Sequence, residues 1–101
     1  MLVILSKSFS ANNSASILDI ALKAAKEGEK VGILHIHDSC IMLTSDQYHR
    51  KLVNAGFNVY ASKADCEARG LLKRTKGVKL VTYREWVQLV MNEYKKIVSW
   101  N

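Results

Sequence analysis

The sequence contains no proline and only five glycines. Because these residues form most irregular turns, their scarcity predicts short and regular connections between secondary-structure elements. The two cysteines, Cys40 and Cys66, are too few for a disulfide framework, so free thiols in a reducing compartment are expected. No apolar run approaches the ~20 residues of a membrane-spanning helix, so no membrane association is expected.

Several targeting and catalytic motifs are also missing. Residues 1–5 are too short an apolar run for a signal peptide and follow no basic residue, which favours a buried first strand and a cytoplasmic location. Neither G-x-G-x-x-G nor G-x-x-x-x-G-K-[ST] occurs, so a nucleotide-phosphate site is not expected. The serines of the first loop, residues 6–10, lack the glycine context of a nucleophile elbow.

The composition is that of an ordinary globular protein. Hydrophobic residues make up 49% of the chain and charged residues 24%, which excludes a disordered chain. No linker or repeat divides the sequence, so one domain over residues 1–101 is predicted. A chain of this length has a limited core, and oligomerisation would add to its stability.

Positive charge is concentrated in one segment of a chain whose formal net charge is +6. Residues 68–84 contain no acidic residue, and we define their basic patch as Arg69, Lys73, Arg74, Lys76 and Lys79. Such a patch could bind an acidic protein or a nucleic acid. It could equally be a solvated loop, because aromatic residues for base stacking are missing between its charges.

Short aliphatic runs predict strands at residues 2–5, 30–37, 57–61 and 78–81. Helices are predicted after each of them, so strands and helices alternate along the chain. This order is typical of a three-layer α/β/α fold with a mainly parallel four-stranded sheet.

The helix ends carry clear signals. Gly28, Gly56 and Gly70 are expected to end helices, and capping boxes are expected at residues 44–47, 62–65 and 82–85. Ligands of parallel sheets bind beyond the carboxyl ends of the strands. The segments to search for a site are therefore residues 6–13, 37–43, 62–65 and 82–85.

Cys40 follows the second predicted strand and is the candidate for sulfur chemistry. A thiol that carries sulfur must ionise, and helix N-termini and nearby cations favour the thiolate. His37 would support ionisation when protonated, whereas Asp38 would oppose it. Alternatively, Cys40 is a small apolar residue in an interface.

His35, His37 and Cys40 have the spacing of three zinc ligands, since side chains two residues apart on a strand share a face. No second cluster supplies the remaining ligands, so neither a metal nor another cofactor is expected. We expect instead that the histidines pack beneath a helix with hydrogen-bonded nitrogens.

Apolar residues near expected surfaces predict a partner interface. Ile41, Met42 and Leu43 follow the second strand, and Trp100 lies one residue from the end of the sequence. A small chain cannot bury all of these together with Tyr83, Trp86 and Tyr94, so some are expected to contact a partner.

Five segments resemble the TusB/DsrH family of DsrE/DsrF/DsrH-like sulfur-relay proteins. The opening residues 1–8, MLVILSKS, look like its hydrophobic first strand followed by K/R-S. Residues 31–38, VGILHIHD, are similar to its second strand, and residues 59–70, VYASKADCEARG, resemble its VYAL-x-x-D-x-x-ARG segment. Residues 80–89 and the ending IVSWN resemble its last helix and terminal tryptophan. Together the segments cover nearly the whole chain in the family's order.

The resemblance implies a DsrE-like fold in a subunit of a sulfurtransferase complex. Such chains assemble with DsrE/TusD-like and DsrF/TusC-like subunits in a heterohexamer, and the TusD-like partner carries the persulfide. The pathway would be 2-thiolation of the tRNA wobble uridine or dissimilatory sulfur oxidation, with a sulfur-carrier protein as a further partner. Direct contact with tRNA is not expected, and whether this chain has catalytic activity of its own is left open.

Two departures from the family pattern bear on sulfur chemistry. Asp38-Ser39-Cys40 replaces the family's Asp-Gly-Val, which introduces a thiol, and the first helix lacks the cysteine of some relatives. The alternatives are therefore an autonomous homo-oligomeric sulfur carrier that uses Cys40, or a binding module that uses the basic patch.

Overall fold

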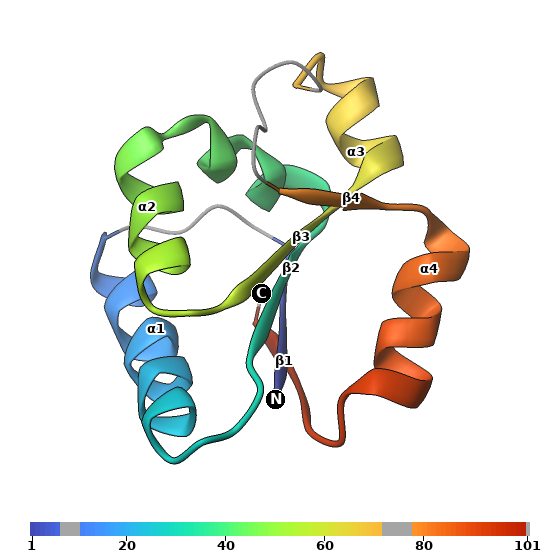
Figure 1. The fold of residues 1–101 in the computed structure, drawn as a ribbon. Coiled ribbons are helices and arrows are strands. Elements are labelled where there is room, and N and C mark those ends of the chain that lie inside the picture. The colour runs from blue at the N-terminus through green and yellow to red at the C-terminus, as the bar shows by residue number, and fades with distance from the viewer. Residues whose placement is uncertain (7–10, 72–77, 101) are drawn as a thin grey trace.

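The computed structural model describes residues 1–6, 11–71 and 78–100, and within them five parallel strands form one sheet (Figure 1). The strand order is β4-β3-β2-β1-β5. The strands are β1 (Leu2–Leu5), β2 (Gly32–His35), β3 (Asn58–Ser62), β4 (Lys79–Val81) and β5 (Ile97–Trp100).

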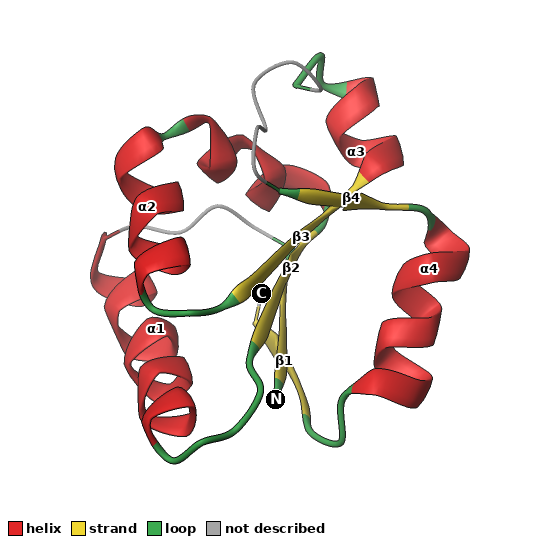
Figure 2. Cartoon of the chain, in the orientation of Figure 1, coloured by secondary structure: helices red, strands yellow, loops and turns green. Residues whose placement is uncertain are grey.

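Helices cover both faces of this sheet (Figure 2). The helical segments are α1 (Ala11–Lys26), the 3-10 helix η1 (His37–Thr44), α2 (Asp46–Asn54), α3 (Lys63–Ala68), α4 (Tyr83–Gln88) and the π-helical turn η3 (Leu89–Glu93). In Figure 1, α1 and α2 lie on one side of the sheet and α4 on the other, while α3 lies beyond the carboxyl ends of the strands. The predicted three-layer α/β/α class is confirmed.

The fifth strand was not predicted. A helix was predicted after the fourth strand with no strand beyond it, whereas the helix ends at Glu93 and Tyr94 is extended. The chain then pairs beside β1, with Leu2 opposite Ile97 and Leu5 opposite Trp100. The strand pairs with the edge that β1 would otherwise leave free, and the local pattern of residues 97–100 does not reveal that distant partner.

Alternating side chains of the strands build two cores. Val3 and Ile33 point into the larger core beneath α1 and α2, whereas Leu2 and Leu34 point into the smaller one beneath α4. Strands buried on both faces explain why the aliphatic runs were continuous.

The helix boundaries confirm most of the predicted signals. Thr82 and Glu85 form the expected capping box, with each side chain accepting a hydrogen bond from the other residue's backbone N–H. Ser62 caps α3 as expected. The cap of α2 is Ser45 rather than Thr44, because Thr44 still belongs to η1 and its hydroxyl donates to the Ile41 carbonyl.

Gly32 is required by the packing of an aromatic pair. The Tyr60 and Tyr94 hydroxyls are 3.0 Å apart, and the Asn58 amide donates to Tyr94 Oη at 3.3 Å. A Cβ at Gly32 would lie 2.5 Å from Tyr94 Oη and 2.8 Å from its ring carbon Cζ. The missing side chain therefore lets the ring that follows η3 close over β2.

The variant Gly32→Ala should accordingly lower the free energy of unfolding by about 1–3 kcal/mol, the usual cost of overpacking a core. Urea denaturation measures the change. Tyr94→Phe removes Oη, the atom closest to the added Cβ. The double variant Gly32→Ala/Tyr94→Phe should therefore lose less stability than the two single variants lose in sum. Additive losses would contradict the proposed contact.

His35 connects β2 to β3 and α2. Its Nδ1 donates to the Tyr60 carbonyl at 3.0 Å, because that oxygen can only accept, and its Nε2 accepts from the Tyr48 hydroxyl at 2.8 Å. The imidazole is therefore neutral, as expected for a packed histidine with hydrogen-bonded nitrogens. Burial lowers its pKa from 6.5 to about 4, against a partly opposing effect of the Tyr60 hydrogen bond.

This pKa makes stability depend on pH. Above pH 6.5 the folded and unfolded states both hold His35 neutral, and between 6.5 and 4 only the unfolded state gains its proton. The loss is about 1.4 kcal/mol per pH unit, or about 3 kcal/mol over that window. Denaturation at pH 7 and 4.5 should show this loss in the wild type and in His37→Gln, but less of it in His35→Gln. Equal losses in all three proteins would contradict the assignment of this pH dependence to His35.

Candidate functional site

The segments after β2 and β3 meet beyond the carboxyl edge of the sheet. At the end of β2 the chain turns at His37, whose φ of +52° is unusual for a residue with a side chain. The His37 N–H donates to Asp65 Oδ2 of α3 at 3.0 Å. The turn places His37 in solvent while His35 is buried, so the two histidines do not share a face as predicted.

Ser39 holds the start of η1 against the sheet. Its side chain is fully buried, and Oγ lies 2.5 Å from the Leu5 carbonyl oxygen and 2.7 Å from the Ile36 carbonyl oxygen. One proton serves one acceptor at a time, but both contacts anchor η1 at this edge. The sequence prediction assigned Ser39 no role, because a serine in a polar segment resembles an ordinary turn residue.

Cys40 and Cys66 lie together beneath this surface. Both are fully buried in the larger core, Cys40 in η1 and Cys66 in α3, and their thiols interact. The Cys40 Sγ–H also donates to the His35 carbonyl at 3.4 Å. The sequence analysis did not pair the two cysteines. Each of them follows the end of one of two neighbouring strands, which is the signal that could have paired them.

The surroundings of the thiols oppose ionisation. Burial, followed by the neighbouring Cys66 thiol and the Asp65 charge, raises the pKa of Cys40 to about 12 against a smaller opposing effect of Arg69. Burial likewise raises the pKa of Cys66. The predicted help from His37 is not among the effects that set the Cys40 pKa.

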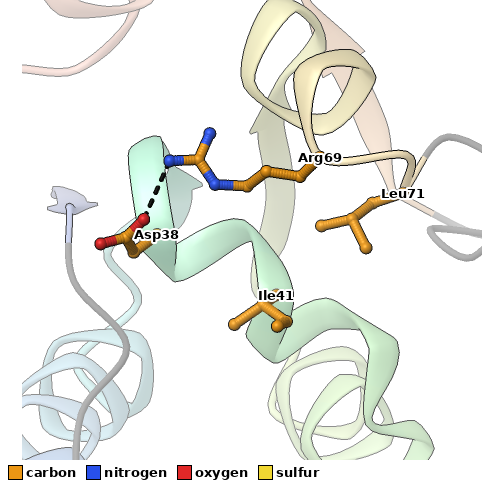
Figure 3. Close-up of a pocket in the computed structure, with 4 residues that line it drawn as sticks. All are labelled: Asp38, Ile41, Arg69 and Leu71. Carbon is orange, nitrogen blue, oxygen red and sulfur yellow. Dashed lines mark hydrogen bonds and ion pairs between the residues drawn. The ribbon is translucent and has the colours of Figure 1, made fainter.

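Charged side chains bridge η1 and α3 above the thiols. Arg69 donates to Asp38 at 2.9 Å, and its guanidinium lies 3.6 Å from the Asp65 carboxylate. With the His37–Asp65 hydrogen bond, these contacts form what we call the η1–α3 clamp. Beside it is a depression of about 360 Å³, shown in Figure 3, whose wall is completed by Ile41 and Leu71.

The η1–α3 clamp includes Arg69, which is one residue of the predicted basic patch. Arg69 is engaged by two carboxylates and is not a free cation. Lys79 is exposed on β4, while Lys73, Arg74 and Lys76 lie outside the described residues.

The residues of the predicted partner interface differ in their exposure to solvent. Ile41 is exposed at the rim of the depression and Met42 is half-buried, but Leu43 is a buried core residue because the 3-10 geometry of η1 turns it inward. The backbone of Trp100 ends β5, and its side chain lies outside the described part of the structure.

Within the described residues, no group of three or more His, Cys, Asp or Glu side chains could hold a metal ion. The same part of the chain contains no helix that is long and apolar enough to cross a membrane. The site therefore consists of a buried dithiol, a charged clamp and a shallow depression.

Two solved structures share this fold. A conserved protein of unknown function, BT1422 from Bacteroides thetaiotaomicron, is 19% identical, with a TM-score of 0.78 over 98% of this chain and 93% of its own. The ychN protein from E. coli is 17% identical, with a TM-score of 0.72 over 98% of this chain and 97% of its own.

At this level of identity the two structures establish the fold alone. No curated protein matches the sequence significantly. The model of a family described as "DsrH like protein" matches residues 9–96, which is most of the chain and includes the clamp and both cysteines. The chain therefore belongs to the DsrH-like family.

Proposed function

We propose that this chain is a non-catalytic subunit of a sulfur-relay complex, which assists persulfide transfer by assembling with DsrE/TusD-like and DsrF/TusC-like subunits. Membership in the DsrH-like family implies a sulfur-relay function in general. The burial of both thiols is the observation that carries the non-catalytic assignment. The relay would serve 2-thiolation of the tRNA wobble uridine or sulfur oxidation.

A relay cysteine must be a thiolate at the moment of transfer and must be reached by the sulfur of its partner. Cys40 and Cys66 meet neither requirement in this fold, since both are fully buried with a raised pKa. Autonomous sulfur transfer by Cys40 would require η1 and α3 to separate. The sulfur-bearing cysteine is therefore assigned to a partner subunit.

Assembly is supported by the surface beside the clamp. Ile41 is exposed next to the Asp38–Arg69 ion pair, which combines an apolar contact with charged groups that can fix orientation. We assign Ile41, Met42 and Trp100 to a partner contact. Because Arg69 is already paired, the described part of the basic patch offers little for direct binding of tRNA.

The thiol assignment predicts slow labelling of the native protein. At pH 8 the thiolate fraction of Cys40 should be about a thousandfold below that of a thiol with the ordinary pKa of 9.0. Alkylation followed by mass mapping should modify neither cysteine within a time that labels both in urea. Rapid native modification of Cys40 would contradict the non-catalytic assignment and favour an autonomous carrier.

The assembly assignment predicts a hetero-oligomer in the cell. The tagged chain, purified gently from its own cytoplasm, should have a native mass equal to two copies each of three different small chains. Cys40→Ala/Cys66→Ala should keep the same companions and the same sulfur-transfer output, provided its circular dichroism matches the wild type. A homo-oligomer without companions, or loss of output in that variant, would overturn the proposal.

A further inference from the structure

The two faces of the sheet are covered unequally. Segments α1, η1 and α2 lie over one face, whereas in the described residues only α4 and η3 cover the other. On that second face the side chains nearest α4, such as Tyr60 and Val81, are buried. Near the β1–β5 edge this face of the sheet is less completely buried, since the Ile4 side chain is half-buried and that of Ile97 is 37% exposed.

The outer side of α4 and η3 carries exposed apolar side chains of its own. Tyr83 is 72% exposed and Met91 is 74% exposed, and Val87 lies between them, half-buried and outside the core cluster. Residues four apart lie on the same side of a helix, so Tyr83 and Val87 are neighbours. The Tyr83 ring packs edge-on against half-buried Trp86 at 5.0 Å between centroids.

Three cations lie beside these apolar residues along the chain. Arg84, Lys95 and Lys96 are exposed, and among the described residues no carboxylate lies within ion-pair distance of them. The two acidic residues of the same segments are engaged elsewhere. Glu85 accepts the cap hydrogen bond of Thr82, and Glu93 lies 3.7 Å from Lys30.

We propose that Tyr83, Trp86, Val87 and Met91, which we call the α4 surface, bind a companion subunit whose apolar contact face is ringed by Asp and Glu. This inference rests on the proposed function. It specifies which face of the chain contacts the companion and which residue types the companion presents there. A second copy of this chain fits poorly, because it would bring the same unpaired cations and a formal charge of +6 to the contact.

The companions that copurify with the wild type are identified by peptide mass mapping, expressed and purified, and used as the binding probe. Tyr83→Lys/Met91→Lys should weaken their association at least about tenfold, because each substitution replaces an apolar contact by a positive charge beside existing cations. The control is Ile20→Lys/Val53→Lys on α1 and α2, whose side chains are 54% and 51% exposed on the opposite layer. It should bind as the wild type does.

The cations beside the α4 surface are tested separately. Lys95→Glu/Lys96→Glu should weaken binding and reduce its dependence on salt, whereas Lys23→Glu/Lys26→Glu on α1 should do neither. The companion bound through this surface should be acidic.

The outcomes separate this inference from the proposed function. Companions that stay bound to Tyr83→Lys/Met91→Lys, or a basic companion, would overturn the α4 surface and leave the assembly function intact. A homodimer dissolved by that variant would show that a second copy occupies the surface and would overturn both. A wild type that has no companions at all would also overturn both.

Discussion

The carboxylate of Asp65 is the centre on which the functional end of the molecule depends. One of its oxygens accepts the backbone N–H of His37, and the other faces Arg69, which in turn binds Asp38. A residue of α3 thereby fixes the turn out of β2, including its unusual backbone conformation. Segments that are distant in sequence become one surface with two thiols beneath it.

The magnitudes indicate which contacts close this surface. Solvent-exposed ion pairs such as Asp38–Arg69 contribute little to stability, so they orient η1 more than they stabilise it. The hydrogen bond from a backbone N–H to a carboxylate contributes about 1.5–3 kcal/mol. Burial of Leu43 and Cys40 in the larger core adds apolar contacts of a similar size. Core packing and the His37–Asp65 hydrogen bond thus hold η1 over the thiols, while the exposed ion pairs of the clamp orient it.

The parts of the fold that could be predicted from sequence were those encoded locally. Four strands appear as short aliphatic runs, and Thr82 with Glu85 encodes a helix start within four residues. The missed features depend on partners distant in sequence. β5 needs the edge of β1, and the inward position of Leu43 follows from a 3-10 helix that has no distinct residue pattern.

The candidate site shows the same division. Topology predicted that residues 37–43 and 62–65 would lie at one edge of the sheet, and they do. Pairing Cys40 with Cys66 required the strand order, which places β2 beside β3. The segment that most resembles the family, residues 59–70, contains both Asp65 and Arg69, so the resemblance coincides with the residues that hold η1 in place.

The pairing of β5 with β1 also constrains the time course of folding. Leu2 pairs with Ile97, so β1 gains this neighbour only from a segment that is far away along the chain. Contacts of such sequence separation close slowly, because a long loop must be ordered before they form. During that interval the β1 edge is unpaired and the apolar side chains of β5 are not yet docked. The finished sheet, and with it the surface beside Ile97, therefore forms only after these two distant strands have paired.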